Sequence, residues 1–191
     1  MRTLLRTLPL LLVALSATAL AQTNPPAAPA AAQASPWSDF NRQAHGQLTE
    51  WLLRSAEKMP EESYGFKPTP AVRSFGQIVG HVADAQYLFC SAVLGETNPA
   101  PKIEKNKTAK AELVVALRNA FAYCEPAYGA MTDASGIQTV KFIWGDMPKL
   151  TILNANNMHT VEHYGNIVTY LRLKGIVPPS SEPGALPQPK S

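Results

Sequence analysis

LTILNANNMHTVEHYG, residues 150–165, is the stretch that decides the fold. The residues that share one face of this stretch recur every three or four positions, which is the period of an amphipathic α-helix. We expect the helix to run from about Leu150 to Lys174, because Gly175 and two prolines follow. His159 and His163 lie four residues apart, so both imidazoles leave the same face of this helix, close enough to bind one ion.

Three other segments have the same helical period. We expect helices over three ranges, about residues 38–59, 74–94 and 109–131. The second opens with Ser74-Phe-Gly-Gln77, which matches a capping box. The third contains Pro126, which should kink the helix or end it early. Residues 139–144 are apolar enough to form a short extended segment. Four amphipathic helices predict an all-α protein, a four-helix bundle.

The first 21 residues have the pattern of a secretory signal peptide. Arg2 and Arg6 precede an apolar run over residues 8–20, and Ala19-Leu-Ala21 offers a small-x-small cleavage site. The apolar run is too short to cross a bilayer. We therefore expect an exported protein, periplasmic or secreted, that has no membrane span.

Composition divides the rest of the chain into three parts. We expect residues 22–36 to be a disordered Pro/Ala linker and residues 180–191 a disordered Pro-rich tail. Residues 37–179 have the length of one domain. Cleavage of the signal peptide removes two of the 17 basic residues and none of the 14 acidic ones, so the formal charge falls from +3 to +1. No basic cluster remains to follow phosphates, which argues against a nucleic-acid partner.

Cys90 and Cys124 are the two cysteines of the chain. An oxidising compartment would allow one disulfide between them, although two separate cysteines on helix faces fit the pattern equally well. Each lies about 16 residues past the start of its helix. The two would therefore lie at the same height if these helices run parallel and at different heights if they run antiparallel. A Cys90–Cys124 bridge would favour a bundle with a crossover connection.

Three of the four histidines lie on inward faces of the expected helices. His81 falls in the apolar stripe of the second helix, as His159 and His163 do in the fourth. One inward histidine is usually a hydrogen-bonded core residue. Three in one core need a partner that compensates for the burial of their polar nitrogens, and a divalent metal supplies it. Neutral imidazole suits zinc, nickel, copper or iron, and three protein ligands leave a position for water or substrate. We expect His45, one turn after the polar Asn41, on a solvated face of the first helix; the alternative is a place near the other three histidines.

The acidic residues near the histidines do not complete a known catalytic motif. In the zincin motif the glutamate directly follows the first histidine, whereas Glu162 directly precedes His163 and points away from the ligand direction. The Glu-x-x-His pairs of di-iron proteins are absent from the sequence. Asp84, one turn after His81, is a candidate to accept the second N–H of that imidazole. The alternative for Asp84 is an exposed place at the helix edge.

Two stretches of the sequence resemble the DinB-like superfamily, which includes the YfiT-type proteins. They are YGFKPTPAVRSFGQIVGHVADA, residues 64–85, and HTVEHYGNIVTYLRLKGIVPP, residues 159–179. The family pattern has one histidine in the second helix and His-x-x-x-His in the fourth, followed by Gly-Gln, Tyr-Leu-Arg and Gly-x-x-Pro; here Asn166 stands in place of the Gln. The resemblance implies an up-down-down-up bundle with helices 2 and 3 parallel. It also implies that a divalent metal, zinc or nickel first, is bound by three ligands, His81, His159 and His163.

The resemblance leaves the reaction open. Members of the superfamily include thiol S-transferases, a maleylpyruvate isomerase and domains of ergothioneine-synthesising enzymes. Low-molecular-weight thiols are cytoplasmic, so for an exported chain we favour a metal-dependent hydrolase acting on an unidentified small molecule. The alternatives are a metal-dependent thiol S-transferase, a non-catalytic module that binds metal or a small ligand, and a helical interaction protein with structural histidines. The sequence does not decide the oligomeric state, and a homodimer is one alternative.

Overall fold

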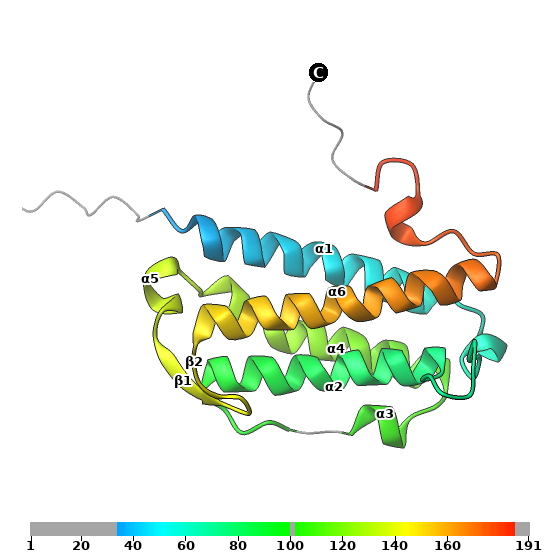
Figure 1. The fold of residues 1–191 in the computed structure, drawn as a ribbon, viewed down its shortest axis with the longest axis horizontal. Helices are drawn as coiled ribbons and strands as arrows, with labels where there is room; N and C mark the ends of the chain where they lie inside the picture. The colour runs from blue at the N-terminus through cyan, green and yellow to red at the C-terminus, as the bar shows by residue number, and fades with distance from the viewer. Residues whose placement is uncertain (1–33, 100–101, 186–191) are drawn as a thin grey trace, which may run out of the picture. The chain divides into compact units, whose positions relative to one another are not determined.

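The computed structural model describes residues 34–99 and 102–185. Four long helices lie lengthwise against one another (Figure 1): α1 (Pro36–Lys58), α2 (Phe75–Leu94), α4 (Lys110–Gly129) and α6 (Lys149–Leu173). Shorter elements connect them: η1 (Glu61–Ser63), α3 (Ile103–Asn106), α5 (Asp133–Gly136), β1 (Thr139–Phe142), β2 (Gly145–Pro148) and η2 (Pro179–Ser181). The expectation of a mainly helical protein is confirmed. The predicted signal peptide and the linker up to residue 33 lie outside the described residues, as do residues 186–191 of the tail.

The ends of the long helices follow the local sequence. At the start of α2 the Ser74 side chain accepts the backbone N–H of Gln77, and the Gln77 side chain accepts that of Ser74, as the capping-box motif predicts. Gly95 ends α2 in the left-handed region at φ 74°. Helix α4 continues through Pro126 and ends three residues later at Gly129. The proline therefore lies in the last turn of α4, and the helix ends within one turn of the residue that removes a backbone hydrogen bond.

Side-chain contacts give the directions of α1 and α6. Near the start of both helices, the Asn157 side-chain N–H group donates to the backbone oxygen of Asn41 over 2.9 Å. Further along both helices, the rings of Trp51 and Tyr164 stack with their centroids 5.1 Å apart. Because these contacts advance in the same direction along both helices, α1 and α6 run parallel.

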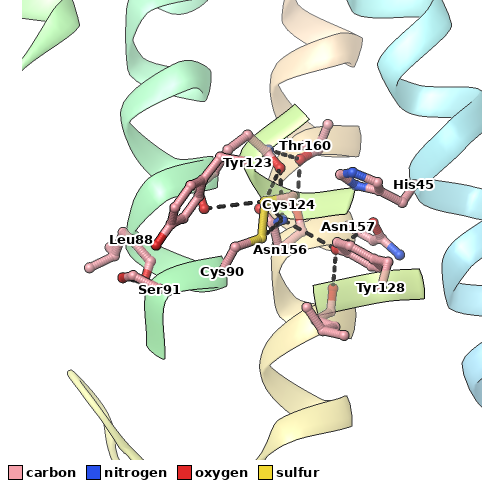
Figure 2. Close-up of a disulfide and its surroundings, with 12 residues drawn as sticks. His45, Leu88, Cys90, Ser91, Tyr123, Cys124, Tyr128, Asn156, Asn157 and Thr160 are labelled. Atoms are coloured by element: carbon pink, nitrogen blue, oxygen red, sulfur yellow. Dashed lines mark hydrogen bonds between the residues drawn. A yellow bond between two sulfur atoms is a disulfide. The ribbon is translucent and has the colours of Figure 1, made fainter. Parts of the chain in front are cut away.

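Helices α2 and α4 also run parallel to each other. Gly76, at the start of α2, lies against Leu113 at the start of α4. Near the other end of both helices, Cys90 and Cys124 form a disulfide (Figure 2). Helix α2 runs antiparallel to α6. His81 faces His163, whereas Gln86, five residues further along α2, contacts Asn156, which lies seven residues earlier in α6. The order is up-down-down-up, as the family resemblance implied.

A β-hairpin interrupts the helical pattern before α6. Strands β1 and β2 pair antiparallel from Thr139↔Pro148 to Phe142↔Gly145. The sequence predicted an extended segment over residues 139–144, but the prediction of an all-α protein did not include its partner strand β2. That strand is rich in neither β-branched nor aromatic residues, so its composition does not indicate a strand. The tip of the hairpin lies beside the end of α2 (Figure 1). Among the described residues, no helix combines the length and apolarity needed to span a membrane.

Two apolar clusters form the core, one on each side of the middle of the α2–α6 seam. The first contains Val82 and Ile167, and the second contains Phe89 and Ile152. Between them α6 carries buried polar side chains that bond to Gln86 of α2, which donates to Thr160 over 3.1 Å and accepts from Asn156 over 2.8 Å. Buried polar groups of this kind fix how α6 is rotated about its axis, because other rotations would leave them unpaired.

Candidate metal centre

The structure brings His81, His159 and His163 together at the α2–α6 seam. The Nε2 atom of His159 lies 3.1 Å from the Nε2 atom of His81 and 3.1 Å from that of His163. One nitrogen from each ring lies within 4.8 Å of the other two. In the part of the chain that the structure describes, this is the one group of histidine, cysteine or acidic side chains with such spacing.

The spacing and charge state of these rings suit a metal ion. Nitrogen ligands about 2.0–2.1 Å from a tetrahedral zinc ion lie about 3.3 Å from one another, close to the spacing observed here. Burial, and then the charges of His163 and His81, lower the pKa of His159 to about 4. Burial also lowers the pKa of His163. Both rings are therefore neutral at pH 7 and offer lone pairs, so the cluster could hold a divalent metal ion.

A carboxylate orients one of the three rings. Oε2 of Glu104 lies 3.0 Å from Nδ1 of His81, and its Oε1 accepts a hydrogen bond from Nε of Arg73 over 2.8 Å. Burial alone would raise the pKa of Glu104, but the hydrogen bond and charge of Arg73, together with His81, lower it. The ionised carboxylate accepts the Nδ1–H of His81, which leaves the lone pair on Nε2 for a ligand bond.

Asp84 has hydrogen-bond partners other than the His81 ring, for which it was a candidate. Its two carboxylate oxygens accept the backbone N–H groups of Ile103 and Glu104, over 2.8 and 3.0 Å. Asp84 therefore holds α3, and through α3 the carboxylate that does reach the histidine. Glu104 could not be found from the sequence, because a helix of four residues has no hydrophobic period and the contact spans 23 residues.

The other two rings have weaker partners on Nδ1. Nδ2 of Asn166 lies 3.5 Å from Nδ1 of His163, at the limit of a hydrogen bond. Because a ring that binds metal through Nε2 carries its proton on Nδ1, the reversed amide would offer an oxygen to that proton. Nδ1 of His159 is buried without a hydrogen-bond partner among the described residues. Asn166, which stands where the resembled family pattern has Gln, is therefore a neighbour of the candidate ligand His163.

His45 is buried, so the prediction of a solvated side chain is wrong. It is 2% exposed and stacks on Tyr128 with ring centroids 3.9 Å apart, while Phe121 meets it edge-on. Burial lowers its pKa to about 4. Neither ring nitrogen has a hydrogen-bond partner within the described ranges. The prediction failed because Asn41, one turn earlier, suggested a polar face, whereas Asn41 is itself buried against Asn157. His45 belongs to the α1–α4 packing, not to the cluster of three histidines.

Two clefts of different character lead to the cluster. The first, of about 700 Å³, reaches His163 and is lined largely by polar side chains, among them Lys67, Arg73 and Glu162. Glu162 is exposed on its helix. The second cleft, of about 420 Å³, reaches His81 and His159 and is mainly apolar. A small molecule could therefore approach the histidines from either side of the seam.

Comparisons with known proteins agree with this fold. A family model described as the DinB superfamily matches residues 44–167. The structure is similar to that of a DinB-like protein from Bacillus cereus (TM-score 0.65, 18% identity, covering 74% of this chain and 95% of that one). It is also similar to a conserved protein from Enterococcus faecalis (TM-score 0.59, 15% identity, covering 71% of this chain and 95% of that one). A third similar structure is the mycothiol-dependent maleylpyruvate isomerase (TM-score 0.56, 15% identity, covering 68% of this chain and 60% of that one). Among curated protein sequences none matches the chain significantly.

Proposed function

The chain belongs to the DinB superfamily, and on this basis we propose that His81, His159 and His163 bind one divalent metal ion, with zinc and nickel as the first candidates. The observation that carries the proposal is the convergence of three Nε2 atoms, with both neighbours of His159 Nε2 at 3.1 Å. Neutral imidazoles suit both metals, and the geometry alone does not favour one of them.

The surrounding residues prepare these nitrogens for a ligand bond. Glu104 holds the His81 proton on Nδ1, and Arg73 keeps Glu104 ionised. Asp84 fixes the backbone that carries Glu104. A metal ion bound here would supply Lewis-acid catalysis by polarising a carbonyl or phosphoryl group or by activating water. Three ligands from the chain leave room for a substrate in the coordination sphere.

We further propose that the protein is an exported, metal-dependent hydrolase of a small molecule, in the periplasm or outside the cell. Clefts that run from the surface to the histidines support a reaction more than a purely structural site. The disulfide between Cys90 and Cys124 fits an oxidising compartment. Residues 1–21 would act as the signal peptide and residues 22–36 as the linker ahead of the domain at residues 37–179.

A metal-dependent thiol transferase is the second candidate. The fold resembles that of the mycothiol-dependent maleylpyruvate isomerase, so a thiol-dependent reaction is compatible with this architecture. Export argues against it, because thiol cofactors are cytoplasmic. Screening the metal-loaded protein against ester, amide and phosphoester substrates, and against thiol-transfer substrates with and without added thiol, separates the two reactions. Turnover that requires a thiol would replace the hydrolase proposal.

Metal analysis of the purified chain tests the site itself. Protein prepared without a histidine tag should contain about one equivalent of metal per chain, or bind one equivalent of added Zn²⁺ in calorimetry. His159→Ala should abolish this binding because it removes the nitrogen at the centre of the cluster. His45→Phe is the matched control, since it removes a buried histidine away from the cluster and should leave the stoichiometry unchanged. Equal metal binding by wild type and His159→Ala would refute the proposal.

A further inference from the structure

The cleft beside His81 and His159 is walled by apolar side chains from two separate elements. Leu88 and Phe89 come from α2, and Ile143 and Trp144 come from the tip of the β1–β2 hairpin. Its volume, about 420 Å³, falls within the usual range of small-molecule sites. The apolar wall therefore begins at the candidate metal ligands and ends at the surface.

The hairpin tip has an unusual composition for a turn. Ile143 and Trp144 occupy the two turn positions between the paired residues Phe142 and Gly145, where Gly, Asn, Asp and Ser are the common choices. They are 63% and 62% exposed. Large apolar side chains left exposed at a turn contribute little to folding, whereas a ligand that covers them would bury their surface.

A row of aromatic rings supports this wall. The Trp144 ring meets Phe142 edge-on, with centroids 5.1 Å apart, and Phe142 packs against Phe89 at 5.2 Å. The Phe89 ring lies 5.8 Å from that of His159. Phe89 is buried in the second apolar cluster, so the row is anchored in the core. A ligand meets a surface that is largely formed before binding, which lowers the entropic cost of association.

Besides the two histidines, the polar residues that line this cleft are Asp84, Asn98 and Lys102. The charge of Asp84 is already engaged by the backbone N–H groups of Ile103 and Glu104, and Lys102 contributes one basic side chain. The cleft on the other side of the seam, by contrast, carries Lys67 and Arg73. The two sides of the histidine cluster thus differ in polarity.

We propose that the apolar cleft binds an aromatic or branched aliphatic group of the substrate, next to the group that reacts at the three histidines. This assignment rests on the proposed metal site. It makes Trp144 and Ile143 specificity-determining residues for the apolar group, although neither belongs to the ligand set. Substrates with a hydrocarbon group adjoining the scissile bond are then preferred to compact, fully polar ones.

Two hydroxamates test the assignment without relying on turnover. Acetohydroxamate chelates metal through its polar group alone, and benzohydroxamate adds a phenyl ring to the same group. Calorimetric titration of the zinc-loaded chain should show that benzohydroxamate binds about tenfold or more tightly, from the surface that the ring buries. Trp144→Ala should remove most of that preference and leave the affinity for acetohydroxamate within about twofold. Trp37→Ala, which truncates an exposed tryptophan on α1, is the control and should change neither affinity.

The outcomes separate the cleft from the metal. If both hydroxamates bind with equal affinity, the metal site stands and the apolar cleft is refuted. If benzohydroxamate keeps its advantage in Trp144→Ala, the ring binds elsewhere and the assignment is also refuted. If neither compound binds although zinc is present, the histidines do not hold an accessible metal, and the proposed function and the assignment fail together.

Discussion

His45 should make the protein less stable in acid, and His45→Phe should remove this effect. The ring is buried with both nitrogens unpaired, and burial lowers its pKa from 6.5 to about 4. The unfolded chain therefore binds a proton more readily than the folded chain between these two values. Stability from this group is complete above pH 6.5, falls as the pH is lowered, and reaches its minimum below about pH 4.

The size of the effect follows from the same pKa shift. At pH 4.5 the unfolded state is favoured by about 2.5 kcal/mol relative to pH 7.5 through protonation of this one ring. Phenylalanine can stack on Tyr128 as the imidazole does but has no nitrogen to protonate. The free energy of unfolding of His45→Phe, minus that of wild type, should therefore increase by about 2.5 kcal/mol between pH 7.5 and pH 4.5.

Urea unfolding at both pH values, followed by far-UV circular dichroism, measures this difference. A chelator in the buffer keeps metal binding by the other histidines out of the comparison. Phe121→Leu is the control, because it alters packing against the same ring without changing a titrating group and should shift stability about equally at both pH values. A pH-independent difference between His45→Phe and wild type would show that His45 is not held neutral by burial.

Three other perturbations have defined outcomes. Glu104→Gln removes the charge that orients His81 and should weaken zinc binding about 10- to 100-fold in calorimetry, whereas Glu112→Gln on the surface of α4 should have no effect. Gly80→Ala places a Cβ atom 2.7 Å from Cα of Glu104; it should displace α3 and weaken zinc binding in the same direction, and unchanged affinity would count against the role of Glu104. Reduction of the Cys90–Cys124 bridge, which spans 34 residues, should lower the free energy of unfolding by about 4 kcal/mol in urea titrations with and without dithiothreitol; an equal midpoint in both would contradict this.

The histidine cluster could be predicted because its members lie on long regular helices. In such a helix, sequence spacing fixes direction, so His159 and His163 had to share a face, and the stripe around His81 placed it inward. The capping box at Ser74 and the left-handed Gly95 marked the ends of α2 for the same local reason. These features depend only on residues within a turn or two of each other.

Glu104 and His45 could not be predicted because each depends on contacts distant in sequence. Glu104 reaches His81 only because Asp84 fixes the backbone of α3, which has no period of its own. His45 is covered by Tyr128 and Phe121, and Asn41, one turn earlier, is buried against Asn157, 116 residues away. Local polarity therefore misassigned a helix face, since a polar side chain that is paired at a distance behaves like a core residue.

The division between helices and connections also bears on what the fold can encode. The three candidate ligands are fixed by packed helices, a buried polar network and a disulfide between α2 and α4. The residues that we propose to select a substrate, by contrast, come partly from a connection, namely Ile143 and Trp144 at the tip of the hairpin. Connections tolerate changes in sequence and length that a packed helix does not. Two proteins can therefore share this bundle and its arrangement of histidines and still act on different molecules. The substrate of this chain has to be inferred from its own clefts, and the apolar cleft next to His159 gives the most specific indication of the substrate.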